Sequence, residues 1–335
     1  MSQSLHVRPL ESRDVEAVAA LRRDALGDGG RDSEPWNEPR RALARKANAE
    51  DGLLLVGEAG GRVVATVAGG YDGVRGWVYG LAVADDCRGW GYGRAMLERL
   101  EDELLRRGCE KINLQIREGN PATAFYEACG YADDRVLGYG KALPCDPDTP
   151  ADPVPTIRVG DDIVLSQITP ADRDAYLTHF NADPVYGAMM SGVPHPYLDA
   201  DADRFILRCL SERFPPSLNR TAPGRRSWAV RESEAGPLVG GIGLFGLTPG
   251  EKGELGYWLA KPLWGRGIMP RVAAAVCEFA FEEWKLRKVE AHALLENAAS
   301  QRVLEKACFT REAVLRSHAF VDGDSRDVAW YGRWA

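Results

Sequence analysis

The stretch Arg88-Gly89-Trp90-Gly91-Tyr92-Gly93-Arg94 decides the fold of the first half of this chain. An apolar, strand-like run, Trp77–Val83, precedes it, and Arg94–Arg107 follows with apolar residues at helical spacing. A turn between a strand and a helix presents free backbone N–H groups and the positive end of the helix dipole. Glycines let a phosphate approach that backbone closely. The pattern predicts a diphosphate-binding turn; the alternative is a tight turn that binds nothing.

Spacing excludes two other phosphate-binding motifs at this turn. The glycines alternate, whereas a dinucleotide fingerprint has the spacing G-x-G-x-x-G. No Gly-Lys-Ser or Gly-Lys-Thr follows, so the turn is not a nucleotide-triphosphate P-loop.

A second turn, Trp264-Gly265-Arg266-Gly267-Ile268-Met269, begins 176 residues after Arg88. It keeps two of the glycines but has Trp264 at the position of Arg88 and Met269 at the position of Gly93. The same order of elements surrounds both turns, which indicates a duplicated fold rather than a short-period repeat.

The elements expected in each half are strands and helices of ordinary length. In the first half these are a helix over 14–26, strands over 53–59, 62–70 and 77–83, a helix over 94–107, a strand over 111–117 and a helix over 122–128. In the second half they are a helix over 171–180, strands over 227–231, 238–245 and 254–259, a helix over 270–284, a strand over 288–294 and a helix over 300–307.

The length of 335 residues agrees with two domains at roughly 150 residues each. The run from Pro144 to Pro155 holds five prolines and three aspartates in twelve residues, which favours a semi-rigid, extended spacer. We therefore expect a domain over 1–143, a linker over 144–156 and a domain over 157–335. Each domain is expected to be α+β, with a mixed, twisted sheet flanked by helices.

Charge and cysteine usage narrow the classes of partner. Residues 1–144 carry a net charge of −3 and residues 145–335 of −4, which accounts for the total of −7. Neither half is basic, so nucleic acid is not expected as a partner.

No apolar run is long enough to span a membrane, and the first residues lack the apolar core of a signal peptide. Seven scattered cysteines without a C-x-x-C pair favour a reducing cytoplasm and no metal site.

The first half resembles the GNAT superfamily of N-acyltransferases over about residues 5–143. The residues that carry the resemblance are Leu81-Ala-Val83 with the first glycine turn, and Phe125-Tyr126-Glu-Ala-Cys-Gly130-Tyr131. The stretch Thr66-Val-Ala-Gly-Gly-Tyr-Asp-Gly73 is most similar to a bacterial, YpeA-like branch of that superfamily.

The second half, about 157–335, resembles the RimJ/RimL-like branch, which contains ribosomal-protein N-terminal acetyltransferases. The ordered set is Gly253-Glu254-Leu-Gly-Tyr-Trp-Leu259, the second glycine turn, Asn297-x-x-Ser300, Leu304-Glu-Lys306, Phe309, His318, Asp322-Gly323 and Asp327. The resemblance implies acetyl-CoA as the co-substrate of both domains, with no metal. The implied CoA-binding residues are Leu81, Val83, Arg88, Gly89, Gly91, Gly93 and Arg94 in the first domain, and Leu259, Trp264, Gly265, Arg266, Gly267, Ile268, Met269 and Asn297 in the second.

Acyl transfer to an amine needs a neutral amine, a polarised thioester carbonyl and a proton for the departing thiolate. The family achieves this in a ternary complex, where two strands separate and expose backbone N–H groups to the thioester. The resemblance implies that these strands are 80–83 with 111–117 and 257–259 with 288–294.

Tyr126 matches the tyrosine that protonates the thiolate; the alternative is an aromatic residue that closes a short helix. The strand before the first turn lacks the carboxylate that the family often has there, and Asn120 lies one residue closer to Tyr126 than is usual.

In the second half Leu304 occupies the tyrosine position, so a tyrosine acid is not expected. Ser300 matches the serine that this branch places against pantetheine and thiolate, with a helix N-cap as an equal alternative. Asn297 would bind the pantetheine amide. Glu254 is the candidate base, with a solvated strand glutamate as the alternative. Acceptor-pocket candidates are Glu38, Asp72, Trp36 and the segment 194–197, with ordinary loop packing favoured for each.

These observations predict an acetyl-CoA-dependent N-acetyltransferase of primary amines, acting on a protein N-terminus or a small molecule. The absence of a strong base favours an α-amine, whose pKa is about 7.7–8.0, over lysine at about 10.4. Two alternatives stay open. One domain is a CoA-binding or docking module without activity, or the acceptor is an antibiotic or an aminoacyl-nucleotide. The sequence leaves open the oligomeric state and which domain catalyses the reaction.

Overall fold

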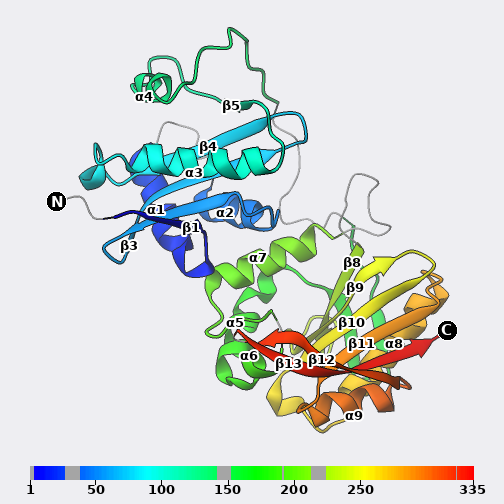
Figure 1. Ribbon diagram of the computed structural model, residues 1–335. Helices are drawn as coiled ribbons and strands as arrows, with labels where there is room; N and C mark the ends of the chain where they lie inside the picture. The colour runs from blue at the N-terminus through cyan, green and yellow to red at the C-terminus, as the bar shows by residue number, and fades with distance from the viewer. Residues whose placement is uncertain (1–3, 27–37, 142–151, 191, 213–223, 322) are drawn as a thin grey trace. The chain divides into compact units, whose positions relative to one another are not determined.

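The computed structural model describes residues 4–26, 38–141, 152–190, 192–212, 224–321 and 323–335 (Figure 1). The chain divides into two compact units, Met1–Pro144 and Cys145–Ala335, and each is described by itself. Most of the expected linker, 144–151, lies outside the described residues.

Unit 1 is a five-stranded sheet with four helices in its described part. The strands lie in chain order, and all neighbours are antiparallel except the last pair, which is parallel. The strands are β1 (His6–Pro9), β2 (Leu54–Ala59), β3 (Arg62–Tyr71), β4 (Gly76–Val83) and β5 (Ile112–Leu114). The helices are α1 (Val15–Leu26), α2 (Pro39–Ala47), α3 (Tyr92–Arg106) and α4 (Thr123–Ala128).

Helix α3 supplies the apolar core of unit 1. Its spacing puts Met96, Leu97, Leu100 and Leu104 on one face, and all four are buried against β2, β3 and β4. Gly69 of β3 has no side chain because Leu100 fills that space: a Cβ there would lie 2.5 Å from the Leu100 Cδ1. Helix α1 packs against β3 and β4 as well as α2.

Unit 2 is an eight-stranded sheet in the order β12-β13-β11-β10-β9-β8-β7-β6, with β10 and β11 parallel. The strands are β6 (Ile157–Val159), β7 (Ile163–Gln167), β8 (Gly224–Arg231), β9 (Gly240–Thr248), β10 (Lys252–Leu259), β11 (Lys288–Leu294), β12 (Thr310–Val321) and β13 (Asp324–Trp334). The helices are α5 (Arg173–Ala182), α6 (Val185–Met189), α7 (Asp199–Leu210), α8 (Ile268–Glu282) and α9 (Ala298–Lys306).

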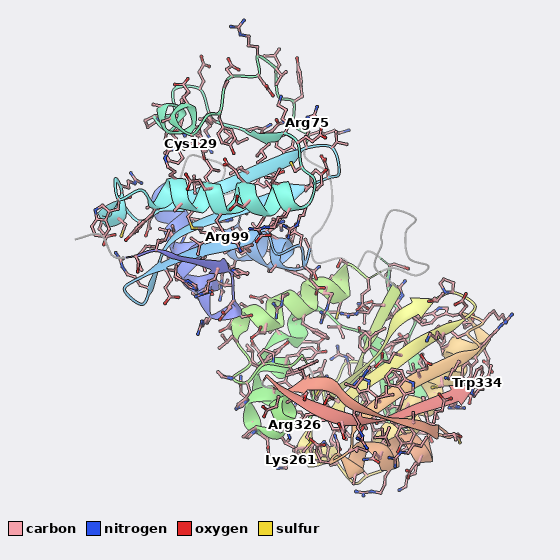
Figure 2. All side chains as sticks on the ribbon, viewed as in Figure 1. Arg75, Arg99, Cys129, Lys261, Arg326 and Trp334 are labelled. Carbon is pink, nitrogen blue, oxygen red and sulfur yellow. The ribbon has the colours of Figure 1, made fainter. Side chains whose placement is uncertain are left out.

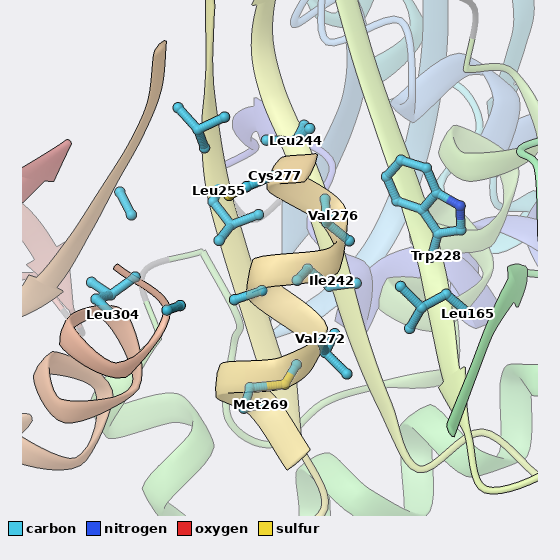
Figure 3. Packing of buried hydrophobic residues seen from close by; sticks show 14 of the residues in the cluster. Leu165, Trp228, Ile242, Leu244, Leu255, Met269, Val272, Val276, Cys277 and Leu304 are labelled. Atoms are coloured by element: carbon cyan, nitrogen blue, oxygen red, sulfur yellow. The ribbon is translucent and has the colours of Figure 1, made fainter. Parts of the chain in front are cut away.

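Two apolar clusters cover the two faces of this sheet. On one face α8 lies across the strands, with Met269, Val272 and Val276 directed at Ile242 and Leu255 (Figure 3). On the other face α5, α6 and α7 form an aromatic cluster around Trp258. The cluster residues include Tyr176, Phe180, Tyr186 and Tyr197, and the ring centroids of Phe180 and Trp258 are 4.7 Å apart.

The α+β fold expected in each half is confirmed, with differences in extent. Strand β5 is shorter than the expected 111–117, since only Ile112–Leu114 pair with β4. Helices α3 and α8 begin two residues before the expected starts, directly after the glycines. The hairpin of β12 and β13, and helices α2, α6 and α7, were not among the expected elements. None of them follows a glycine-rich turn, although α7 has buried apolar residues at helical spacing, namely Ala202, Ile206, Cys209 and Leu210.

A substitution at Trp228 tests how the core of unit 2 is packed. This side chain is fully buried and stacks on Trp284, with ring centroids 5.8 Å apart. We predict that Trp228→Ala lowers the free energy of unfolding by about 3–5 kcal/mol because it leaves a large cavity. Phe320→Ala, at a ring that is 66% exposed, should change it by about 0.5 kcal/mol or less. Urea denaturation of the full chain measures both, and equal effects would contradict this description of the core.

Candidate active site

In the described part of each unit one pair of strands is parallel, and one strand of the pair runs on past the pairing. In unit 1 β5 ends where its pairing with β4 ends, whereas in unit 2 both β10 and β11 continue beyond it. Strand β4 pairs with β5 only as far as Val78 and Leu114. Strand β10 pairs with β11 only as far as Leu255 and Ala291. Beyond these points β4 and β10 continue to Val83 and Leu259 without that neighbour. Their backbone groups on that side are available to a ligand, as an opening between the strands requires.

A glycine turn follows each separated strand. In unit 1 Gly89 and Gly91 have φ of 79° and 84°, and α3 begins directly after Gly91. In unit 2 Gly265 and Gly267 have φ of 76° and 71°, and α8 begins directly after Gly267. A Cβ at any of these four glycines would meet no atom within 4 Å. The glycines are therefore needed for backbone conformation, and the space beside them is open.

Side chains of the first turn contact residues that lie before it in the chain and on α4. The exposed Arg88 pairs with Asp85 at 2.7 Å, and the Arg94 guanidinium donates to the Ala128 carbonyl, at the end of α4, at 2.8 Å. Gly93 faces α4, since a Cβ there would lie 3.3 Å from the Phe125 Cζ.

The second turn has different side-chain roles. The Trp264 indole N–H donates to the Leu259 carbonyl at 2.7 Å, and Arg266 pairs with Glu232 at 3.2 Å. Ile268 and Met269 are buried in the core, so only their backbone N–H groups can face a ligand. Lys261, at the start of this turn, pairs with Asp183 next to α6 (Figure 2).

Glu254 and His292 form a pair where β10 and β11 separate. Glu254 Oε1 lies 2.6 Å from His292 Nδ1. His292 is the first residue of β11 after its pairing with β10 ends. The two side chains are about one-third exposed, at 36% and 28%. With Nδ1–H donating to the carboxylate, a neutral imidazole presents its Nε2 lone pair as a proton acceptor.

Aromatic contacts hold the His292 ring in place. Trp330 of β13 is the strand partner of His292, and the two rings stack with centroids 5.7 Å apart and planes at 6°. His318 lies edge-on to both rings. The sequence pattern indicated Glu254 and His318 but gave no indication of the contact that His292 makes with Glu254. Alternation along β11, which turns His292 to the face opposite Ala291 and Ala293, is the signal that could have found it.

Ser300 is not the N-cap of α9, so that alternative is wrong. Asn297 is the N-cap, and its Oδ1 accepts the backbone N–H of Ser300 at 3.0 Å. The Ser300 hydroxyl is instead 2.8 Å from the Tyr257 hydroxyl, which also lies 3.2 Å from the Ser300 carbonyl oxygen. Leu304, at the expected tyrosine position, is fully buried in the core.

Tyr257 therefore brings a phenol to the Ser300 hydroxyl, from β10 and not from the Leu304 position of α9. It stands on the separated part of β10, and burial raises the pKa of its hydroxyl. The hydrogen bond with Ser300 acts in the opposite direction on that pKa. A phenol held in its protonated form can serve as a proton donor.

In unit 1 the matching tyrosine is Tyr126, on α4. It is partly buried between Phe125 and Tyr131, with ring centroids at 5.1 Å and 5.8 Å. Burial raises the pKa of Tyr126, which keeps its hydroxyl protonated. Asn120, by contrast, is used locally: its Oδ1 accepts the Ala122 N–H at the start of α4.

Unit 1 lacks the pair that unit 2 has. Counted from the last parallel partners, Trp77 occupies the position of Glu254, and Gln115 occupies that of His292. The Glu38 carboxylate caps α2 and that of Asp72 closes a turn, because each accepts two backbone N–H groups.

Two further acceptor-pocket candidates came from the sequence. Tyr197 is buried in the aromatic cluster, and Trp36 lies outside the described residues. Across the described ranges, no three His, Cys, Asp or Glu side chains gather to hold a metal ion. None of the helices in that part of the chain is long and apolar enough to cross a membrane.

Comparisons with known proteins agree with this geometry. Residues 16–131 match the model of the acetyltransferase (GNAT) family, and residues 162–310 match that of an acetyltransferase (GNAT) domain. Among solved structures, RimJ of Mycobacterium smegmatis with CoA-disulfide is 22% identical, covering 55% of this chain and 88% of its own, with a TM-score of 0.45. The ribosomal L7/L12 α-N-protein acetyltransferase RimL, with coenzyme A, is 16% identical over 54% and 98%, with a TM-score of 0.46. The ribosomal-protein-S5-alanine acetyltransferase of Vibrio fischeri is 15% identical over 54% and 97%, with a TM-score of 0.45.

Both glycine turns, both strand separations and most of the described chain fall within the two matched ranges. The chain belongs to the GNAT family of acetyltransferases, with two domains of that family in tandem.

Proposed function

We propose that the second domain transfers the acetyl group of acetyl-CoA to a primary amine, with His292 as the general base. The observation that carries this proposal is the 2.6 Å contact of Glu254 Oε1 with His292 Nδ1 at the strand separation. The carboxylate orients the ring and stabilises the imidazolium that forms when Nε2 takes a proton. Glu254 is thus a positioning residue in this proposal, whereas the sequence suggested it as the base itself.

In the proposed reaction, the amine nitrogen attacks the thioester carbon while His292 removes one proton from that nitrogen. The C–S bond breaks, and the electron pair leaves with sulfur as the CoA thiolate. The free backbone N–H groups of β10 beyond Leu255 would stabilise negative charge on the carbonyl oxygen.

The thiolate then needs a proton, and we assign this step to Ser300 and Tyr257. Their hydroxyls are 2.8 Å apart, so a proton given up by Ser300 can be replaced from Tyr257. Asn297 fixes Ser300 through the backbone, which places the hydroxyl at the first turn of α9.

We propose an α-amine as the acceptor, on a protein N-terminus or a small molecule. An α-amine, with a pKa of about 7.7–8.0, is partly neutral at pH 7, and one imidazole is a sufficient base for it. The RimJ/RimL-like sequence pattern of the second half favours the protein N-terminus.

For the first domain we propose acetyl-CoA binding at the turn over 88–94, with Tyr126 next to the sulfur. We propose that the first domain spans residues 1–143 and the second domain spans residues 157–335, with residues 144–156 as the linker. Because Trp77 and Gln115 stand where the second domain has Glu254 and His292, the Glu–His pair has no counterpart at these positions of the first domain. In this proposal the first domain uses a different base or serves as a docking module. Its YpeA-like sequence pattern assigns no substrate.

The base assignment predicts that His292→Gln lowers kcat/KM about 10²–10⁴-fold with little change in the KM for acetyl-CoA. Glu254→Gln should lower kcat by a smaller factor than His292→Gln does, because it removes only the group that orients the imidazole. CoA release is measured with the full chain and the best acceptor from a set of unblocked peptides and small amines.

Glu290→Gln is the matched control for this measurement. Glu290 lies on the same face of β11 but pairs with Lys252 and Lys288, so its loss should leave kcat/KM within about twofold. A His292→Gln rate within about threefold of wild type would contradict the assignment.

The acid assignment predicts that Ser300→Ala and Tyr257→Phe lower kcat by similar factors of about 10–100. The double variant should lose little more than either single one, because the two hydroxyls act in one relay. Rapid-quench measurement of acetyl transfer in a single turnover reports this step. Independent, multiplicative losses would show that the hydroxyls act separately.

The two glycine turns can be separated by substitution. Gly267→Asp puts a side chain and a negative charge beside the second turn, and kcat/KM for acetyl-CoA should fall at least about 100-fold. Gly91→Asp should remove acetyl-CoA binding by the first domain and leave most of the transfer rate. Gly250→Asp, also at a positive φ of 71° with open space, controls for backbone strain. If acetyl transfer persists in Gly267→Asp and is lost in Gly91→Asp, the first domain is the catalytic one.

A further inference from the structure

Arg22, on α1 of unit 1, is a buried cation without a partner. Its Nε and Nη2 are inaccessible to solvent and have no hydrogen-bond acceptor. Burial alone lowers the pKa of Arg22 to about 10, with no described carboxylate acting on it. An unpaired buried charge is costly to a fold, so a chain that retains one needs a reason for it.

Arg8 and Arg231, by contrast, are paired with carboxylates. Arg8 is held by Asp14 at 2.6 Å and Glu58 at 3.0 Å, and these carboxylates raise its pKa. Arg231 is held by Asp172 at 2.8 Å. Among the described residues, no such carboxylate acts on Arg22.

The Arg22 guanidinium lies against the separated segment of β4. A Cβ on Gly80 would be 3.1 Å from the Arg22 Cζ and 3.3 Å from its Nη2. Gly80 has a φ of 55° and belongs to a bulge, where Tyr79 to Ala82 of β4 lie opposite Thr66 to Ala68 of β3. Gly80 is two residues past Val78, at which pairing with β5 ends. The guanidinium is therefore next to the backbone that a bound acyl group would contact.

We propose that Arg22 binds a carboxylate of the substrate of the first domain, next to the reacting centre. A planar guanidinium matches a carboxylate through two parallel N–H···O bonds. The unused N–H groups of Arg22 on Nε and Nη2 are closed to solvent in this structure, so binding requires the side chains around them to move. The single positive charge of a guanidinium matches the single negative charge of a carboxylate. The amine acceptor of this domain is then a small amino acid, with its carboxylate a few bonds from the amine.

This inference rests on the acetyl-CoA binding proposed for the first domain and adds the chemical class of its acceptor. The same carboxylate chemistry could also come from the acyl group, as in succinyl-CoA. The experiment therefore compares glycine and β-alanine with glycinamide, which lacks the carboxylate, and succinyl-CoA with acetyl-CoA.

Hydrogen exchange of the full chain, read by mass spectrometry on peptides from α1 and β4, localises the effect to unit 1. We expect glycine or β-alanine to slow exchange in these peptides and glycinamide not to do so. In Arg22→Met the carboxylate concentration for half-maximal protection should rise at least about tenfold. Arg23→Met, at the exposed neighbour on the same helix, should keep the wild-type response.

Stability supplies a second, independent readout. Without any carboxylate, Arg22→Met should unfold at the same temperature as wild type or higher, because it removes a buried unpaired charge. If Arg22→Met does not fold, Arg22→Lys keeps the charge without the two-pronged geometry and should also weaken protection about tenfold.

Protection by succinyl-CoA beyond that by acetyl-CoA, lost in the variant, would support the proposal with the carboxylate on the acyl group. Absence of carboxylate-specific protection, or equal protection in Arg22→Met, would overturn it.

Discussion

The site depends on one constraint: two parallel strands that pair at one end and separate at the other. In the second domain the last pair is Leu255 with Ala291, and everything assigned to chemistry lies at or just beyond it. Separation frees backbone N–H groups of β10 that a continuous sheet would have used. It also opens the space into which the Glu254–His292 pair faces on one side of the sheet. On the other side Tyr257 meets Ser300.

Much of the architecture could be predicted from sequence because its signals are local. Alternating glycines at 89, 91, 265 and 267 mark backbone conformations that other residues rarely adopt, and all four have positive φ. Helical spacing after each turn correctly located α3 and α8. The outer hairpin of β12 and β13 carries mixed polar and apolar residues with several exposed positions, so its period was not evident.

The contacts of the site could not be predicted in the same way, because they depend on register between distant strands. Glu254 and His292 are 38 positions apart and meet only because β10 and β11 are parallel in one particular register. A shift by one residue would turn His292 into the core. Tyr257 and Ser300 are 43 positions apart, and their contact needs both the strand and the start of α9. The sequence resemblance pointed to Ser300 and Glu254 one at a time. Their partners, Tyr257 and His292, are evident only from the structure.

The two domains share one backbone arrangement but differ in the side chains that lie beside it. Both have the separation and the turn, yet Trp77 replaces the carboxylate, and a buried arginine without a counterion lies against the first separated strand. A fold gains nothing in stability from an uncompensated charge. In the second domain a carboxylate and an imidazole pair where β10 and β11 part, whereas in the first domain Arg22 lies beside β4 with no described carboxylate acting on it. The glycine turns are shared by the two domains, and the charged groups beside them differ.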